Sequence, residues 1–300
     1  LAGLVRQEDL IWAHDYHLLC LAEALREAGL RNRMGLFLHT PFPPQELFMQ
    51  IPWRRELIEG LLGADLVGFQ VPGGATNFAR LARQLTGATG DNQLLEHDGR
   101  DVSVGAFPIS IDTATLSEIA RRDDVRKRAD EIREALGHPD VVLMGIDRLD
   151  YTKGILHRLR AYGELLNEGR LGARTVLVQV ASPSRERVET YRELRDDVEQ
   201  TVSRINGQHG EVGSSPVHYL HQSYPREEMA ALYLAADVML VTPLRDGMNL
   251  VAKEYVACRN DESGALVLSE FTGAADELAG ALLVNPHDIE GLKEAIVRAA

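Results

Sequence analysis

The stretch VVLMGIDRLDYTKGILHRLRAYGELL at residues 141–166, followed by TVLVQVA at residues 175–181, decides the fold class. Its two ends are compact apolar runs of strand length, and between them apolar residues recur at helical spacing, as at Leu156, Leu159 and Leu165. A strand, a helix and a second strand in this order favour parallel strands joined by helices. We therefore expect an α/β fold in which parallel sheets are covered on both faces.

The same alternation extends along the chain and predicts two doubly wound domains. A highly charged stretch at 121–133 separates two series of apolar runs, and we expect it to form an exposed helix after a turn that ends at Asp112. The expected domains are 1–112 and 113–300. The first is expected to be incomplete, because its first strand has no glycine-rich turn after it and only nine residues before it. The expected strands are 10–13, 34–38, 65–69, 102–107, 141–146, 175–181, 217–220, 237–241, 265–268 and 281–284.

The composition is that of a globular protein with an acidic surface. The 300 residues are 45% hydrophobic and 26% charged, and 45 acidic against 32 Lys and Arg residues give a net charge of −13. Such a surface repels phosphate backbones and anionic lipids, so we expect neither nucleic acid nor a membrane as partner. Two cysteines allow no disulfide framework. The chain contains no long apolar span and does not open on a leader pattern, which predicts a cytoplasmic protein.

Polar residues of catalytic type follow the predicted strands. In open α/β sheets, ligands bind beyond the carboxyl ends of the strands, so these residues outline a candidate site. They are His14, Asp15, His17, His39, Gln70, Arg148, Lys153, Ser182, Ser184, Arg185 and residues 245–249.

The turn after residue 146 carries two cations, Arg148 and Lys153, and leads through Gly154 into a helix. A guanidinium fork and an ammonium group suit a diphosphate. A surface ion pair of Arg148 with Asp147 or Asp150 fits this run equally well.

The segment TPLRDGMNLVAKE at 242–254 predicts a helix that begins near Asn249. Free backbone amides at 247–250 would then be able to hold phosphate oxygens, and Glu254 would lie about one turn inside the helix, where it could accept hydrogen bonds from a ribose. The alternative is a capped helix, with Asp246 or Asn249 as cap and Glu254 paired to Lys253 or Arg259. Both interpretations can hold at once.

Other readings of these residues have less support. His14, Asp15 and His17 lack the spacing of a metal site, and no further ligands follow at a usable distance. Neither Ser182 nor Ser184 lies in a G-x-S-x-G turn. Taken singly, His39 fits a buried, hydrogen-bonded histidine.

Six motifs together closely resemble the trehalose-6-phosphate synthase family: HDYH at 14–17, LHTPFP at 38–43, GADLVGFQ at 63–70, DRLDYTKG at 147–154, RING at 204–207 and RDGMNLVAKEY at 245–255. The resemblance implies two Rossmann-like domains of the GT-B type that face a cleft, with acceptor binding in 1–112 and nucleotide-sugar binding in 113–300. It also implies a retaining transfer of glucose from a nucleotide sugar, commonly UDP-glucose, to glucose 6-phosphate, with no metal and no cofactor.

The resemblance further implies a role for individual residues. Arg148 and Lys153 would bind the donor diphosphate, and the donor would also meet the amides of Gly247, Met248, Asn249 and Leu250. Glu254 would hold the ribose, Asp246 the donor-sugar hydroxyls and His39 the donor glucose near its 6-hydroxyl. Asp15 and Gln70 would face the acceptor, and Arg185 its phosphate. The implied catalytic residues are His39, Arg148, Lys153 and Asp246.

Three other functions remain open from the sequence. A related synthase could use another phosphorylated acceptor and form a glucosylglycerol phosphate or a pseudo-disaccharide. A non-catalytic regulatory domain could bind a sugar phosphate without turnover, and an epimerase could use the same fold. The family's N-terminal glycine-rich loop and last helices are expected to be absent from this stretch, and the sequence leaves open whether the protein forms a homo-oligomer.

Overall fold

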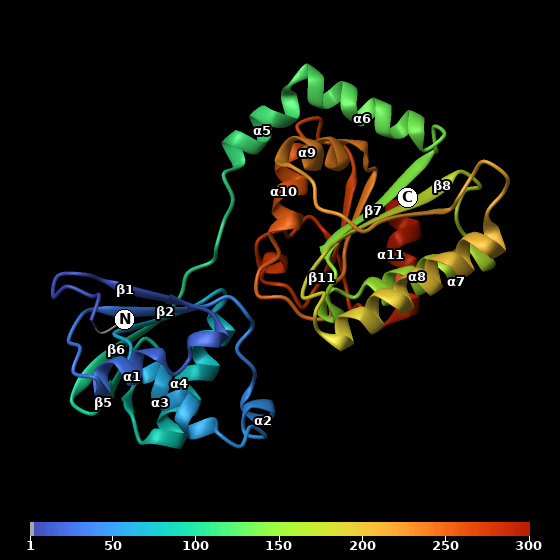
Figure 1. Cartoon of the computed structure of the whole chain (residues 1–300). Helices are drawn as coiled ribbons and strands as arrows, with labels where there is room; N and C mark the ends of the chain where they lie inside the picture. Colours follow the sequence, from blue (N-terminus) through green and yellow to red (C-terminus); the bar gives the residue numbers. More distant parts are fainter. Residues whose placement is uncertain (1–2) are drawn as a thin grey trace. The chain divides into compact units, whose positions relative to one another are not determined.

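The computed structural model describes residues 3–300, which divide into two compact units between Ile109 and Ser110. The boundary predicted at Asp112 lies just beyond this division. Asp112 caps the first helix of the second unit, α5 (Thr113–Arg121), by accepting a hydrogen bond from the amide of Thr115 at 3.0 Å. Each unit contains a six-stranded sheet with helices packed on it, so the predicted α/β class is confirmed (Figure 1).

The sheet of the first unit is mixed rather than purely parallel. Its order is β1-β2-β3-β6-β5-β4, in which the first four strands run parallel and β5 and β4 run antiparallel. The parallel strands correspond to the four predicted ones. The hairpin of β4 and β5 was not predicted, because β4 has only two residues and half of β5 is polar. The strands are β1 (Ile11–His14), β2 (Met34–Leu38), β3 (Leu66–Phe69), β4 (Thr89–Gly90), β5 (Leu94–His97) and β6 (Arg100–Ala106).

The two faces of this first sheet differ. Alternate strand residues such as Leu36, Val67 and Val104 enter one apolar core together with buried residues of the helices. Elsewhere on the strands, aromatic rings lie directly over glycines. Trp12 covers Gly35, for example, and a Cβ atom at Gly35 would lie only 2.0 Å from the ring, so a larger residue would collide with it. The helices are η1 (Tyr16–Leu18), α1 (Leu21–Glu27), α2 (Gln45–Phe48), α3 (Arg54–Leu62) and α4 (Pro72–Thr86).

The second unit has a parallel sheet with a core on each face. Its order is β12-β11-β10-β7-β8-β9, with every pair parallel. Val142 and Met144 enter one core and Leu143 the other, as expected for a sheet with helices on both sides. The strands are β7 (Val141–Arg148), β8 (Thr175–Ser182), β9 (Val217–Leu220), β10 (Val238–Val241), β11 (Ala265–Ser269) and β12 (Leu282–Val284).

Helices cover both faces of this second sheet (Figure 1). Besides α5 they are α6 (Asp123–Ala135), η2 (Tyr151–Lys153), α7 (Ile155–Asn167), α8 (Glu189–His209), α9 (Arg226–Ala235), α10 (Leu250–Cys258), η3 (Gly273–Asp276) and α11 (Ile289–Ala299). None of the helices in the described chain combines the length and apolar character that a membrane span requires.

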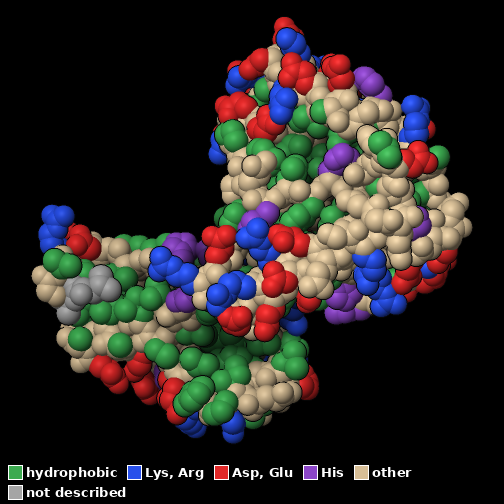
Figure 2. Space-filling model, turned by 45° about the vertical axis from the view of Figure 1, so that its right-hand side comes forward, with side chains coloured by type: hydrophobic (Ala, Val, Ile, Leu, Met, Phe, Trp, Pro, Cys, Tyr) green, Lys and Arg blue, Asp and Glu red, His purple; other side chains and the backbone are tan. Residues whose placement is uncertain are grey.

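The charged stretch at 121–133 forms α6, but the helix is not exposed all round. Val125, Ala129 and Ile132 are buried in the first core of the unit. Beside this stripe, Arg128 forms an ion pair with Glu228 of α9 at 2.9 Å, and Figure 2 shows basic and acidic side chains interspersed over this end of the unit. The apolar residues are few among the charges, which is why the buried stripe was missed.

A buried ion pair lies beneath the carboxyl ends of three strands. Arg158 on α7 is fully buried and donates from Nη1 to Asp147 at 2.7 Å and to Gln179 at 2.7 Å, and from Nε to Thr242 at 3.2 Å. Asp147 lies near the end of β7, Gln179 is on β8, and Thr242 follows β10. Gly145 makes room for the guanidinium, since a Cβ atom there would lie 2.0 Å from Nη1.

Candidate active site

The end of β1 positions Asp15 across the end of β2. Asp15 has a φ of 69°, and its Oδ1 accepts hydrogen bonds from the amides of His39 at 3.2 Å and Thr40 at 3.3 Å, and from the Thr40 hydroxyl at 3.3 Å. The non-glycine residue in the left-handed region is unusual, and such strain is found most often at functional sites. The Asp15 carboxylate is thus fixed beside His39, at the ends of two neighbouring strands.

His39, Gln70 and His14 form one hydrogen-bonded row at the same edge. His39 Nε2 lies 3.0 Å from Nδ1 of His14, and its Nδ1 lies 3.2 Å from Nε2 of Gln70. Gln70 is buried, and its Oε1 accepts the amide of Ile109 at 3.0 Å. The structure therefore brings the predicted residues Asp15, His39 and Gln70 together.

In the second unit, the turn after β7 is held against the end of β10. Gly154 has a φ of 66°, and a Cβ atom there would lie 2.2 Å from the carbonyl oxygen of Thr242, so only glycine fits. The amide of Leu244 donates to the carbonyl oxygen of Thr152 at 2.7 Å and closes the same contact. This close approach brings Lys153 to Asp246, whose Oδ2 lies 2.5 Å from Nζ.

Arg148 ends β7 with its side chain exposed, and it forms no hydrogen bond or ion pair within residues 3–300. A contact ion pair with Asp147 or Asp150 is therefore not formed, although Arg148 lies close enough to Asp150 to interact with it electrostatically. Asp147 bonds Arg158 instead, and Asp150 accepts from the amide and hydroxyl of Thr152 at 2.9 and 2.7 Å.

The loop between β10 and α10 holds Asp246 from several sides. Its amide donates to the carbonyl oxygen of Phe271 at 3.0 Å, and its Oδ2 also accepts from Nδ2 of Asn249 at 3.1 Å. Asn249 caps α10, as one sequence alternative predicted, because its Oδ1 accepts the amide of Ala252 at 3.1 Å. In the part of the chain that the structure describes, the amides of the buried residues Gly247 and Met248 find no acceptor.

Glu254 lies one turn inside α10 and does not pair with Lys253 or Arg259, the partners weighed from the sequence. Its Oε2 accepts the hydroxyl of Tyr233 at 2.7 Å, while Lys253 bonds Glu277 at 2.8 Å. Burial and the neighbouring carboxylate of Glu254 raise the pKa of the Tyr233 hydroxyl well above its usual range, so that hydroxyl stays a donor. The second carboxylate oxygen of Glu254 has no partner within the described residues.

Tyr191, a residue that the sequence did not point to, links Arg185 to Asp150 at the carboxyl end of the sheet. Nη1 of Arg185 donates to the hydroxyl of Tyr191 at 2.9 Å, and that hydroxyl donates to Oδ2 of Asp150 at 3.0 Å. Burial opposes ionisation of Asp150, but the bonds from Thr152 and Tyr191 outweigh it and lower the pKa of the carboxyl. Tyr191 lies on α8, 41 residues from Asp150, and no local pattern could have revealed the contact.

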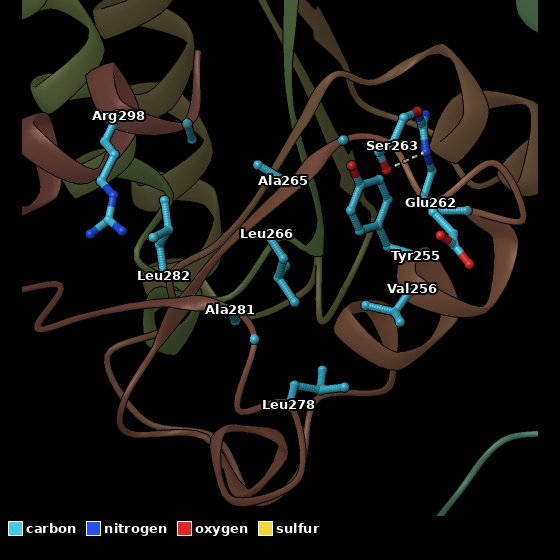
Figure 3. A pocket seen from close by; sticks show the side chains of 14 residues that line it. Tyr255, Val256, Glu262, Ser263, Ala265, Leu266, Leu278, Ala281, Leu282 and Arg298 are labelled. Atoms are coloured by element: carbon cyan, nitrogen blue, oxygen red, sulfur yellow. Dashed lines mark hydrogen bonds between the residues drawn. The ribbon is translucent and has the colours of Figure 1, made fainter.

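A hollow of about 600 Å³ lies at the opposite end of this sheet (Figure 3). It is lined from α10, β11, β12 and α11, with Leu266, Leu278 and Leu282 among the labelled side chains. Because Ala265 and Leu282 begin their strands, the hollow belongs to the amino ends and contains none of the predicted site residues. Among residues 3–300, no three His, Cys, Asp or Glu side chains are grouped to hold a metal ion.

The sequence profile of glycosyltransferase family 20 matches residues 1–300. The chain belongs to glycosyltransferase family 20. A family 20 relative from Mycobacterium avium strain 104, named trehalose-6-phosphate synthase, is 59% identical over 296 residues, which cover 95% of this chain and 60% of the relative. A protein of the same name from Mycobacterium leprae is 60% identical over 299 residues, covering 95% and 59%. The chain thus spans about 60% of the length of these curated relatives.

Solved structures agree with the family 20 assignment. An α,α-trehalose-phosphate synthase (UDP-forming) from Burkholderia xenovorans, in complex with glucose 6-phosphate, is 41% identical and superposes with a TM-score of 0.93, covering 100% of this chain and 68% of that one. A structure from Escherichia coli described as trehalose-6-phosphate bound with UDP-2-fluoro glucose is 38% identical with a TM-score of 0.91, covering 99% and 66%.

Proposed function

We propose that this chain carries the donor-binding and much of the acceptor-binding machinery of a retaining glucosyltransferase, which transfers glucose from UDP-glucose to glucose 6-phosphate and forms trehalose 6-phosphate. The observation that carries the proposal is the cluster at the carboxyl ends of β7 and β10. Arg148, the Lys153–Asp246 pair and the buried amides of Gly247 and Met248 lie there together. Family 20 relatives described with UDP-2-fluoro glucose and with glucose 6-phosphate support this choice of substrates.

The donor diphosphate is proposed to lie against the second unit, residues 110–300. Arg148 supplies a guanidinium that forms no hydrogen bond or ion pair in the described chain. The amides at 247–250 lie at the N-terminus of α10, where the partial positive charge of a helix favours an anion. Glu254 is held on one oxygen by Tyr233, which leaves the other oxygen for the ribose hydroxyls. Each group thus matches one part of a nucleoside diphosphate.

The chemistry proposed for this cluster is stabilisation of the leaving group. As the bond between the sugar C1 and the diphosphate oxygen breaks, negative charge grows on that oxygen and positive charge grows on the sugar ring. Lys153 is held by Asp246 before the reaction, so it stabilises the growing charge with little reorganisation, and Arg148 adds a second positive charge at the end of β7. The acceptor hydroxyl attacks C1 from the face that the leaving group vacates and gives its proton to the departing phosphate oxygen. The configuration at C1 is then retained without a carboxylate nucleophile.

Asp246 is proposed to orient the donor sugar. Its Oδ2 is engaged by Lys153 and Asn249, and its backbone amide is tied to Phe271. The carboxylate therefore has one settled orientation, in which Oδ1 is available to sugar hydroxyls. Fixing a charged group by several contacts is what keeps it within the narrow geometry that catalysis requires.

The acceptor is proposed to meet Asp15 and Gln70 through its hydroxyls and Arg185 through its phosphate, while His39 is proposed to contact the donor glucose. Asp15 is fixed by three donors on residues 39–40, and Arg185 is oriented by the Tyr191 hydroxyl. An arginine whose planar group is already oriented loses less freedom when it binds a phosphate.

A product assay on the full-length protein tests the proposal. UDP-, ADP- and GDP-glucose are each paired with glucose 6-phosphate and with glycerol 3-phosphate, and the products are identified by NMR. We expect trehalose 6-phosphate and UDP from UDP-glucose and glucose 6-phosphate, with the α configuration retained at both anomeric carbons. A glucosylglycerol phosphate would establish the other acceptor class, and donor hydrolysis or isomerisation without an acceptor would contradict the transferase function.

A further inference from the structure

The hydrogen bonds that run from Ile109 through Gln70 and His39 to His14 have only one consistent direction. A backbone N–H can only donate, so the Gln70 atom that faces the amide of Ile109 at 3.0 Å must be its carbonyl oxygen, Oε1. The NH₂ group of Gln70 then faces Nδ1 of His39 at 3.2 Å. The opposite amide orientation would set two donors against each other at Ile109. The orientation of Gln70 is therefore settled by the chain itself.

This orientation determines the tautomers of both imidazoles. Nδ1 of His39 accepts from the Gln70 amide, so the ring carries its proton on Nε2. That N–H donates to Nδ1 of His14 at 3.0 Å, and His14 in turn carries its proton on Nε2. His39 thus uses both of its ring nitrogens within the row, and only His14 offers an N–H outside it, at Nε2. Neither ring is arranged to accept a proton from a sugar hydroxyl.

The surroundings hold the row in place and leave its far end accessible. The two imidazoles are stacked with centroids 5.2 Å apart, and His14 also packs edge-on against Trp12 at 5.7 Å. Gln70 is buried, whereas His14 is exposed, and its Nε2 has no partner within residues 3–300. His14 lies directly before Asp15, at the strand end where the proposed sugar-binding residues gather.

We propose that Gln70 is a positioning residue that holds His39 and His14 in the Nε2–H tautomer, and that His14 is a further substrate-binding residue, which offers its N–H to a hydroxyl oxygen of a sugar substrate. This inference rests on the proposed function for its ligand. It assigns hydrogen-bond donation, and not proton acceptance, to His14, in agreement with a mechanism in which the leaving phosphate takes the acceptor proton.

The tautomers are measured by long-range ¹H–¹⁵N NMR of histidine-labelled full-length protein. We expect protonated Nε2 and unprotonated Nδ1 for both rings in the wild type, with the signals assigned by His14→Phe and His39→Phe. In Gln70→Glu the carboxylate still accepts the amide of Ile109 but now also accepts from His39, so a proton should move onto Nδ1 of that ring. A wild-type His39 protonated at Nδ1, or unchanged ring signals in Gln70→Glu, would overturn the proposal.

Steady-state kinetics separate positioning from a merely structural role. Gln70→Glu preserves the bond to Ile109, so a structural role predicts normal rates. The proposal predicts a loss of about tenfold or more in kcat/KM, the effect of one lost hydrogen bond, together with the changed ring signals. Loss of a direct contact between Gln70 and the acceptor would instead raise only the KM of glucose 6-phosphate and leave the ring signals unchanged. His14→Phe keeps the ring stacking and should raise the KM of a sugar substrate by a similar factor. His209→Phe is the matched control, because His209 ends α8 in the second unit, where its Nε2 lies 2.9 Å from Asn167, outside the row.

The outcomes distinguish this inference from the proposed function. A wild type that forms no trehalose 6-phosphate refutes the function, while the ¹⁵N signals still report whether Gln70 sets the tautomers. Normal KM values for both sugars in His14→Phe refute the binding role of His14 while the synthase activity stands.

Discussion

The buried pair of Arg158 and Asp147 gives the sharpest prediction of stability. Their side chains are 0% and 2% exposed, so water hydrates neither charge and each depends on the other for stabilisation. Arg158→Met keeps the length and apolar stem of the side chain but leaves the Asp147 carboxylate buried without its partner. Leaving one member of a buried pair alone typically costs about 3–5 kcal/mol, and we expect a loss of this size in the second unit.

Urea unfolding followed by circular dichroism measures the loss, and a double-mutant cycle isolates its cause. Asp147→Asn introduced into Arg158→Met removes the unpaired charge and should recover a large part of the lost stability. Arg160→Met on the same helix is the control, since Arg160 is exposed and its i,i+4 pair with Glu164 contributes only about 0.3–0.5 kcal/mol. A cost below about 1 kcal/mol for Arg158→Met, or strictly additive losses in the double variant, would refute the reasoning.

Further predictions concern the proposed site and one thiol. Arg148→Ala should lower turnover by about 10²-fold, as loss of a comparable transition-state donor does elsewhere, and near-normal turnover would exclude Arg148 as a leaving-group contact. Arg185→Ala should raise the KM of glucose 6-phosphate strongly and that of the donor little, whereas equal weakening of both, measured by separate titrations, would place the phosphate elsewhere. A chelator should leave the rate unchanged, because Arg148 and Lys153 supply the positive charge; a loss restored by Mg²⁺ would contradict this. Burial raises the pKa of the Cys258 thiol to about 11, so at pH 8 a disulfide reagent should label exposed Cys20 quickly and Cys258 only after unfolding, and rapid labelling of two thiols in the folded protein would show that Cys258 is accessible.

The long apolar strands could be predicted from the sequence because a buried parallel strand leaves a continuous apolar run. The hairpin β4–β5 could not, since Thr89 and Gly90 form a two-residue strand that carries no pattern. The buried stripe of α6 was likewise hidden among charges. The burial of Arg158 could not be predicted from a sequence pattern, because an arginine is taken for a surface residue in any hydrophobic period. Its buried partners lie in two strands and directly after a third.

The candidate site residues were chosen from the sequence because they follow strands. The sequence did not indicate which of them contact one another. The start of α10 at Leu250 follows from a local capping rule and was predicted with Asn249 as an alternative cap. The pairs formed by Lys153 with Asp246 and by Tyr191 with Asp150 join residues 93 and 41 positions apart. Such contacts depend on how the strands are ordered in the sheet, which a single sequence does not reveal. The roles assigned to these residues remain predictions.

The contact between Lys153 and Asp246 also bears on which anions the site selects. Their side chains are only 13% and 19% exposed, so dissolved salt screens the pair weakly. A free phosphate or nucleotide that approaches Lys153 must compete with a counter-ion already in place, and it also meets the negative charge of Asp246. A nucleotide that carries glucose brings hydroxyl donors to that carboxylate at the same moment. On the proposed function, Asp246 therefore competes with simple anions for Lys153. A sugar nucleotide can replace Asp246 at Lys153 because the hydroxyls of its glucose bind the Asp246 carboxylate in turn.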